Sequence, residues 1–525
     1  MAKPGFPGIV RRFARSDLLP VAALLLLGSA AFVHLTALPA FEDEGSQLRW
    51  VWRAIEAGEW LLPMDEGKPL EAWPMVPLVQ LGLAPPLVVT RALHVLAGMI
   101  AAVLTWRSAL AVLERPAAFA SGVLFAICPF AVYLQRLALS DMFLCAAGTW
   151  VLVNSLVLMQ SPTRPRAVAL GISLVLAAFC KMPIGFVFLT SIPIALLLMP
   201  VCERQRMLRQ PAVLAKLLMA HAPAAMLALV VVITAVIRWR HGHSPGFGLQ
   251  DLVGIGLGNN QEMGAGAGVS RPNLVVELTT QLSWPVTVIA LIGLGAGALL
   301  GDWRVRWLVV LGMLPMLGIG LLVHFWYSRY LLFTLPPLII AAVSGWQSLA
   351  LRVGRLRTPV EIAVLSVCAG LMGWQSTRLV LDPATARWSP LDRFQYFEGW
   401  GSGYGFPEAA RFVLAASEAP RMIYALDGHS AYQLRNYLPP SWNSRIEPIY
   451  YGDDGRYLRT DEDRLRNLLE HTPAWIVIPA QLLDSYLDSA FHRRNRASRI
   501  ELQRIATFEK PGARVQLALY RVTRH

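Results

Sequence analysis

Residues 18–45 read LLPVAALLLLGSAAFVHLTALPAFEDEG, an apolar run that ends in three carboxylates. The part from Leu18 to Leu38 is long enough to cross a bilayer as a helix, since a crossing needs about 20 apolar residues. Three arginines, the last of them Arg15, precede the run. The run is longer than the apolar region of a signal peptide and lacks a small-x-small cleavage site. We therefore interpret it as a retained anchor helix with its basic end in the cytoplasm.

The composition is that of an integral membrane protein. Hydrophobic residues make up 55% of the 525 residues, charged residues 15%, and the mean hydropathy is +0.47, whereas a soluble domain carries about a quarter charged residues. Apolar runs recur up to about residue 380, and the composition beyond is that of a soluble protein. We predict a transmembrane domain at 1–380, with external loops 39–85 and 238–280, and an extracytoplasmic α/β domain at 381–525.

Hydropathy predicts about eleven transmembrane helices. They lie near 18–38, 86–111, 117–135, 141–160, 167–181, 184–200, 213–237, 281–300, 306–324, 330–350 and 359–380. Each loop that this count places inside carries arginine, for example Arg164 and Arg166, as the positive-inside rule requires. An odd count puts the N-terminus in the cytoplasm and the C-terminal domain outside.

The net charge of +13 does not indicate a nucleic-acid partner. From Leu381 onward the chain holds 19 Lys and Arg against 17 Asp and Glu, so most of the excess lies in loops between spans. All five cysteines fall within or beside apolar spans and none forms a CxxC pair, so neither a zinc site nor a disulfide framework is predicted. His241-Gly242-His243 is too small a set to predict a metal site. No cofactor is predicted, and a divalent metal stays open.

The two long external loops differ in character. In the first, Leu48, Val51 and Ile55 recur at helical spacing, which predicts an amphipathic helix in the membrane interface, followed by a second interfacial segment after Trp60. The second loop is rich in glycine, and one interpretation is a segment that orders over substrate. No strand is predicted before it, so it is not typical of a nucleotide-phosphate loop.

The C-terminal domain alternates helix and strand patterns. Helices are predicted near 407–417, 431–437, 461–471 and 482–491, strands near 422–426, 446–450 and 475–478, and a closing hairpin at 500–508 and 514–522. The glycine- and aromatic-rich stretch 394–405 precedes them. It suits carbohydrate contact, and the alternative is a linker that packs its aromatic rings on the membrane domain.

The acidic residues Glu42, Asp43 and Glu44 follow the first span, on the side placed outside. Group transfer to a hydroxyl or amine needs a base or a carboxylate that orients the nucleophile. Asp43 and Glu44 are therefore candidate catalytic residues. The alternative is that one of them caps the following helix through its first-turn amides.

Further candidates lie at the outer ends of later spans. Arg136 and Asp141 stand at the start of the fourth span. Lys181 ends the fifth, and Arg329 enters the tenth. Outer basic residues run against the topological bias, and Lys or Arg is a natural partner for a phosphate anion. A capping role for Asp141 and snorkelling of Arg136 to lipid head groups are the alternatives.

Several motifs occur in an order that resembles a known family. Glu42-Asp43-Glu44, Ala57-Gly58-Glu59-Trp60 and Gly67-Lys68-Pro69 resemble the first external loop of GT-C glycosyltransferases, above all bacterial relatives of protein O-mannosyltransferases and the lipid A aminoarabinose transferase. Later matches are Arg136-Leu137-Ala138-Leu139-Ser140-Asp141, Lys181-Met182-Pro183 and Arg329-Tyr330-Leu331-Leu332. The resemblance covers about residues 18–350.

The resemblance implies a polytopic α-helical membrane protein of the GT-C type. It also implies inverting sugar transfer from a polyprenyl phosphate carrier to a cell-envelope lipid, glycan or protein at the extracytoplasmic face. Asp43 would be the catalytic carboxylate, with Glu44 beside it and Asp141 as a supporting carboxylate. Lys181 and Arg329 would bind the donor phosphate.

Four residues are expected to line the substrate cavity: Glu71, Arg136, Tyr327 and Tyr330. One departure from the family pattern concerns Glu71-Ala72-Trp73-Pro74, where aminoarabinose transferases typically read Glu-Lys-Pro. The lysine is missing. The resemblance therefore does not carry over aminoarabinose transfer itself or a lipid-phosphate contact at this place.

These observations predict a multi-pass protein of the bacterial plasma membrane. Its partners would be the bilayer, a lipid-linked sugar donor and an envelope acceptor. The alternative is a transporter or flippase of lipid-linked intermediates. Transporters commonly place ionisable groups near the bilayer midplane and show internal repeats, whereas the charges here cluster at span ends and no convincing repeat is present. The sequence identifies neither the sugar nor the acceptor.

Overall fold

The structure is a computed structural model that describes residues 14–241, 246–247, 273–323, 326–399, 401–425, 428–448, 474–480, 500–512 and 515–524. The chain divides into two compact units. The first comprises Met1–Leu35, Leu61–Pro74 and Arg91–Ser389, and the second Thr36–Trp60, Met75–Thr90 and Pro390–His525. The first external loop is thus shared between the units. Most of the second external loop lies outside the described residues.

The described secondary structure of the first unit is helical throughout. Its elements are η1 (Arg15–Asp17), α1 (Leu18–Ser29), η2 (Ala30–Phe32), α3 (Leu62–Asp65), α4 (Pro69–Ala72), α6 (Pro86–Ala109, whose first residues fall in the second unit), α7 (Arg115–Ala126), α8 (Pro129–Leu134), α9 (Ser140–Gln160), α10 (Arg164–Cys180), α11 (Met182–Gly185), η3 (Phe186–Thr190), α12 (Ser191–Leu198), α13 (Val201–Leu208), α14 (Pro211–Arg240), α17 (Leu274–Leu282), α18 (Trp284–Leu300), α19 (Trp303–Leu317), η4 (Gly318–Leu322), η5 (Ser328–Thr334), α20 (Leu335–Ala350), η6 (Leu351–Leu356) and α21 (Arg357–Leu381).

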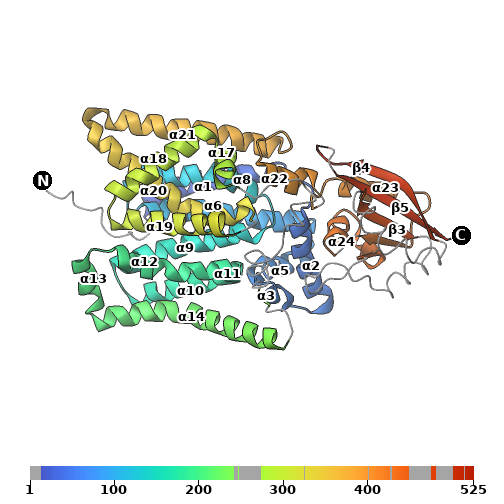
Figure 1. Ribbon diagram of the computed structural model, residues 1–525, viewed down its shortest axis with the longest axis horizontal. Helices are drawn as coiled ribbons and strands as arrows, with labels where there is room; N and C mark the ends of the chain where they lie inside the picture. Colours follow the sequence, from blue (N-terminus) through green and yellow to red (C-terminus); the bar gives the residue numbers. More distant parts are fainter. Residues whose placement is uncertain are drawn as a thin grey trace. The chain divides into compact units, whose positions relative to one another are not determined.

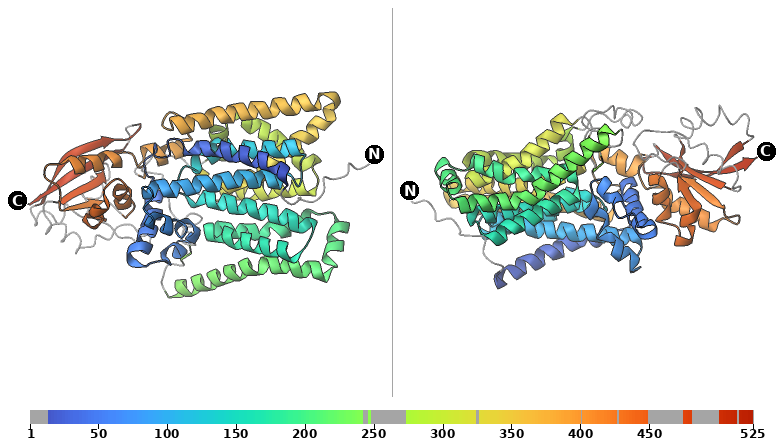
Figure 2. Two further views of the ribbon diagram at one scale, coloured as in Figure 1. Left: turned by 180° about the vertical axis from the view of Figure 1, so that it is seen from behind. Right: turned by 90° about the horizontal axis from the view of Figure 1, so that it is seen from below.

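These helices form a bundle that joins sequence neighbours and helices further apart in the chain. The helix α9 packs on α10, α10 on α14, and α18 on α20, and Figure 1 shows α9, α10 and α14 side by side. Figure 2 shows the same bundle from behind and from below. Small residues allow the closest approaches, since a Cβ on Gly345 would lie within van der Waals overlap of the Gly293 carbonyl oxygen.

Six helices in the described residues are long and apolar enough to cross a membrane, or up to eight if each of two bent pairs is one span. The count of about eleven is therefore not confirmed. Part of the difference lies in length, because α10 has 17 residues and α7 only 12. Another part lies in one continuous stretch of 54 residues, Ser328–Leu381. As one straight helix at 1.5 Å per residue it would measure roughly 80 Å, more than twice the hydrocarbon thickness.

That long stretch is broken at Gly354, whose φ is +63°. A left-handed backbone at this position interrupts the helix and separates α20 from α21. The two predicted spans at 330–350 and 359–380 correspond to these two arms. A second break lies at Ser283, between α17 and α18, where the axes bend by 112°.

The second unit combines helices with one sheet. Its elements are α2 (Glu42–Ala57), α5 (Met75–Gln80), α22 (Pro390–Arg393), η7 (Phe394–Glu398), α23 (Phe406–Ala415), β1 (Met422–Ala425), α24 (Gly428–Arg435), η8 (Pro440–Arg445), β2 (Ile446–Pro448), β3 (Ala474–Pro479), β4 (Ile500–Glu509) and β5 (Gln516–Arg524). The strand order is β2-β1-β3-β5-β4. The strand β1 is parallel to β2 and β3, whereas β5 runs antiparallel to β3 and β4.

Alternating strand residues form two apolar layers. Trp475 and Val477 join Leu517 and the helices α23 and α24 in one cluster, while Ile476 faces the other way. This is the two-residue period of a strand buried on both faces. The strands predicted near 422–426, 446–450 and 475–478 and the closing hairpin are confirmed, as are the helices corresponding to α23 and α24. The helices predicted at 461–471 and 482–491 lie outside the described residues.

The helix predicted from Leu48, Val51 and Ile55 is α2, which begins six residues earlier than that pattern, at Glu42. Its apolar face is covered by protein, since Leu48 is fully buried and packs with Ala40 and Leu87, and α2 packs on α24 and α5. The expectation of an apolar face lying in the membrane interface differs from this packing. An amphipathic pattern reports that one face is buried, not whether lipid or protein covers it.

Candidate active site

Three of the predicted site residues meet in the first unit. Asp141 lies in the first turn of α9, Lys181 joins α10 to α11, and Arg329 belongs to η5. Prolines lie in the first turns of α11 and α20, where a proline favours the start of a helix. Each charged side chain is thus carried by a helix end rather than by a helix centre.

Asp141 lies between the two cations. Lys181 Nζ donates to Asp141 Oδ1 at 2.9 Å, and Arg329 Nε lies 3.9 Å from Asp141 Oδ2. The side chains of Lys181, Asp141 and Arg329 are 12%, 5% and 7% exposed. Burial of this kind is costly unless opposite charges compensate one another. The cluster carries one more positive than negative charge, so it retains attraction for an anion.

Two tyrosines complete this cluster. Lys181 Nζ lies 4.2 Å from the centre of the Tyr330 ring, and the guanidinium of Arg329 lies 4.5 Å from the centre of the Tyr327 ring. The two rings pack edge to face. Cation–π contacts hold each cation in place while leaving its N–H groups directed elsewhere. Tyr327 and Tyr330, predicted as cavity residues, therefore lie in direct contact with the predicted phosphate-binding residues.

Glu71 also belongs to this unit. It is fully buried in α4, a short helix that packs on α9 and α10. The backbone N–H of Met182 donates to the carbonyl of Gly67 at 2.8 Å, which ties the segment before α4 to the residue after Lys181. Trp73, two residues beyond Glu71, packs against Phe179 of α10.

Arg136 is buried and bound to main-chain carbonyls. Its guanidinium donates to Leu379 at 2.5 Å, to His34 at 2.7 Å and to Val33 at 3.2 Å. These bonds hold the end of α21 beside the chain that leaves the first membrane helix. The geometry favours a structural use of this guanidinium, and its expected place in the substrate cavity stays a prediction.

Asp43 and Glu44 belong to the second unit. The Phe41 backbone N–H donates to Glu44 Oε2 at 2.9 Å, and Glu44 is fully buried. Glu44 therefore takes part in the cap of α2, through the amide of the N-cap residue Phe41 rather than through a first-turn amide. Asp43, in the same first turn, is only partly buried, so its carboxylate is the more accessible of the two. The catalytic roles of both stay predictions.

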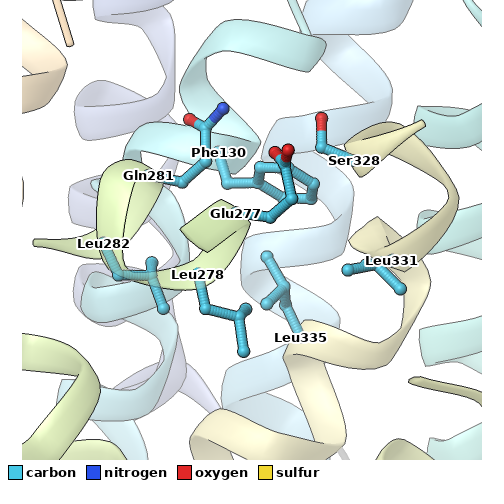
Figure 3. A pocket seen from close by; sticks show the side chains of 8 residues that line it. All are labelled: Phe130, Glu277, Leu278, Gln281, Leu282, Ser328, Leu331 and Leu335. Atoms are coloured by element: carbon cyan, nitrogen blue, oxygen red, sulfur yellow. The ribbon is translucent and has the colours of Figure 1, made fainter. Parts of the chain in front are cut away.

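A small pocket lies between α8, α17, η5 and α20. Figure 3 shows that Glu277 and Gln281 leave the same face of α17 and that Ser328 lies on η5 nearby. Glu277 is 4% and Gln281 3% exposed. The remaining lining is apolar, with Phe130 and leucines. Ser328 adjoins Arg329 in the chain, so this pocket begins beside the charged cluster.

The described residues contain no group of three or more His, Cys, Asp or Glu side chains that could hold a metal ion. Of the loop histidines, His241 ends α14 and His243 lies outside the described residues.

Comparison with solved structures identifies the architecture. The crystal structure of ArnT from Cupriavidus metallidurans bound to undecaprenyl phosphate superposes with a TM-score of 0.60 at 15% identity, covering 96% of this chain and 98% of that one. The Archaeoglobus fulgidus oligosaccharyltransferase AglB, in complex with an inhibitory peptide and a dolichol-phosphate, superposes with a TM-score of 0.56 at 10% identity, covering 96% and 74%.

This chain has their fold. The resemblance to GT-C glycosyltransferases, read from motifs between Glu42 and Leu332, is thereby confirmed at the level of fold. No family model matches the sequence, and no curated protein matches it.

Sequence reasoning missed several buried polar residues that bind main-chain carbonyls within their own unit. Arg91, fully buried in α6, donates to the Leu35 carbonyl at 2.8 Å. Its charge within an apolar span was the available signal, since intramembrane ionisable residues are rare. Gln433 and Lys510 in the second unit had no such signal, because isolated polar residues of a soluble domain are usually on its surface.

Proposed function

We propose that this protein is an inverting glycosyltransferase that moves a sugar from a polyprenyl phosphate carrier to a cell-envelope lipid, glycan or protein. The observation that carries the proposal is the pairing of Lys181 and Arg329 around Asp141, in a membrane fold shared with ArnT and AglB. ArnT in that structure is bound to undecaprenyl phosphate, and AglB is in complex with a dolichol-phosphate. The reaction is proposed at the extracytoplasmic face, with about eleven spans and the N-terminus in the cytoplasm.

In the proposed reaction, a hydroxyl or amine of the acceptor attacks the anomeric carbon of the sugar. The bond from that carbon to the phosphate oxygen breaks, and its electron pair leaves with the phosphate. Lys181 and Arg329 stabilise the charge that develops there, while Asp141 orients them. Asp43 receives the proton of the attacking group. Glu71, Tyr327 and Tyr330 are assigned to the surrounding cavity.

Reconstitution in lipid nanodiscs with polyprenyl phosphate sugars tests the proposal. Wild-type protein should release polyprenyl phosphate in an acceptor-dependent manner. Lys181→Ala and Arg329→Ala should lower kcat/KM for the donor by at least about a hundredfold, the size expected for a lost charge-stabilising group. The matched control is Lys216→Ala, whose ammonium binds only the Pro162 carbonyl among the bonds observed; it should behave as wild type.

The transporter alternative gives the opposite pattern in the same preparation. Absence of turnover with every donor, together with movement of lipid-linked sugar across proteoliposome membranes, would overturn the proposal. Asp43→Asn gives the second check. Full transfer activity in this variant would remove Asp43 from the mechanism and leave the phosphate-binding assignment in place.

A further inference from the structure

Lys510 is a buried lysine that the proposed reaction does not use. It follows β4 directly, and the residue is 3% exposed. Its Nζ donates to the carbonyls of Gly399 at 2.9 Å and Ser402 at 2.8 Å. Burying an ammonium group costs free energy unless its N–H groups are hydrogen-bonded. A lysine at this position therefore indicates that buried carbonyl groups need its N–H donors. The carbonyls that accept these hydrogen bonds belong to Gly399 and Ser402, in the loop between η7 and α23.

This loop holds the start of the acidic helix. The backbone N–H of Glu42 donates to the Gly401 carbonyl at 3.0 Å. The side-chain amide of Gln433 donates to the same carbonyl at 3.0 Å and to the carbonyl of Ala40 at 2.9 Å. The Ala40 N–H donates to the Tyr437 hydroxyl at 2.5 Å. Residues 40–42 are thus held by hydrogen bonds to three residues: Gly401, Gln433 and Tyr437.

The loop and the acidic stretch also touch through their backbones. A Cβ on Gly403 would lie within van der Waals overlap of the Ala40 carbonyl oxygen, and one on Gly401 would lie 2.5 Å from a carboxylate oxygen of Glu42. At Gly403 the neighbouring atom is backbone, so only glycine permits this approach. Phe41 adds a ring contact, its centroid 4.9 Å from that of Tyr396. A displacement of the loop therefore has to displace the first turn of α2.

Asp43 lies in that first turn, one residue beyond the bonded segment. We infer that Lys510 is a positioning residue: by holding the loop 399–403 it fixes the start of α2 and thereby the carboxylate of Asp43. This gives the C-terminal part of the chain a role in the reaction. The inference rests on the proposed function, since it assumes that Asp43 acts in transfer.

The charged groups around Lys510 are consistent with this role. Burial lowers the pKa of Lys510 to about 7, and the Glu42 carboxylate acts in the opposite direction. Glu398 lies against Gly512 and is paired with Arg393. A neutral amine still has two N–H groups, so both carbonyls can remain satisfied when the lysine loses its proton. The anchor therefore does not depend on the charge of Lys510.

Lys510→Met tests the inference, because methionine fills the space and donates nothing. Hydrogen exchange of the amides in residues 40–45 should accelerate by at least about tenfold, while exchange in β3 stays unchanged. In the transfer assay kcat should fall about ten- to hundredfold with little change in KM for the donor, as expected for a misplaced catalytic group. Lys510→Arg, which keeps the donors, should recover part of kcat.

The control is Arg504→Met, which removes an exposed basic side chain from the same hairpin and should leave exchange and kcat as in wild type. If Lys510→Met does not fold, Gln433→Leu removes the two other donors to this segment and should give the same exchange result. Unchanged exchange at residues 40–45 in a folded variant overturns the inference. Accelerated exchange in a protein whose wild type transfers no sugar overturns the proposed function and leaves the anchor in place.

Discussion

At the scale of single residues, Asp141 affects the binding of an anion in two opposite ways. Its carboxylate neutralises part of the charge of Lys181 and Arg329, and it also fixes the direction of both side chains. A bound phosphate would meet cations that are already ordered. The loss of freedom on binding is then small, and this is the benefit of preorganisation.

Asp141→Asn separates these two effects. Removing one partner of a buried ion pair costs about 3–5 kcal/mol, so we expect a lower melting temperature in detergent. Added undecaprenyl phosphate should restore more of the stability in the variant than in wild type, because the phosphate then supplies the missing negative charge. Differential scanning fluorimetry with and without the lipid measures this. An equal lipid-induced shift in both proteins would contradict the assignment of Lys181 and Arg329.

Lys510 predicts a pH dependence of stability. Its pKa is lowered from 10.5 to about 7 by burial, so between these pH values the unfolded chain holds a proton that the folded protein has lost. Stability rises with pH wherever the unfolded state binds more protons. Between pH 7 and about 10.5 the free energy of unfolding of the wild type should therefore rise with pH relative to that of Lys510→Met. Below pH 7 the difference between the two proteins should stay constant. Melting temperatures at pH 6–10 measure this, and parallel curves for the two proteins would show the expectation to be wrong.

At the scale of elements, the turn between α17 and α18 stores strain. Ser283 has φ +71° and ψ 148°, a region that is essentially restricted to glycine and costs about 1–3 kcal/mol for other residues. Its buried hydroxyl has no hydrogen-bond partner in the part of the chain that the structure describes. The turn sets the direction in which α17 carries Glu277 and Gln281 toward the pocket.

Ser283→Gly should therefore stabilise the protein by about 1 kcal/mol. This is the free energy of the relieved backbone strain minus the cost of the larger conformational entropy that glycine gives the unfolded chain. Ser283→Ala is the matched comparison, since it removes the hydroxyl and keeps the strained backbone. Melting temperatures of both variants, measured in the same detergent, show which variant is more stable. A glycine variant that melts below the alanine variant would show that this backbone conformation is not strained.

Elements could be predicted where a local pattern determines them. The strand at Trp475–Ile478 is a β-branched and aromatic run after a proline, and it forms as expected. The predicted topology placed Asp141, Lys181 and Arg329 at the outer ends of spans, and the family resemblance implied that they serve one site. Lys510 and Gln433 could not be found in this way. Their partners are main-chain carbonyls far away in the chain. Every residue has a main-chain carbonyl, so the amino-acid sequence does not indicate which carbonyl accepts the hydrogen bond.

At the scale of the whole molecule, the side of the membrane that the C-terminal residues occupy depends on whether the number of crossings is odd or even. Within the part of the chain that the structure describes, six helices are long and apolar enough to cross a membrane, or up to eight if each bent pair is one span. Both numbers are even, whereas about eleven is odd. Part of the difference arises because Ser328–Leu381 is one of these six helices, although Gly354 divides it into two arms. Length alone therefore cannot decide the side, and the distribution of arginine is the stronger argument.

The chain offers a direct test of that side. Cys202 is exposed on α13, two residues before the first of three arginines predicted to lie in the cytoplasm, and the C-terminal residues from 381 onward contain no cysteine. In intact spheroplasts a membrane-impermeant maleimide should not label wild-type protein, and should label Ser417→Cys, at an exposed position after α23. Permeabilisation should then expose Cys202. Labelling of wild-type Cys202 before permeabilisation, with Ser417→Cys adding nothing, would place the C-terminal residues in the cytoplasm. Asp43, which α2 carries in the same compact unit, would then have no access to an extracytoplasmic acceptor.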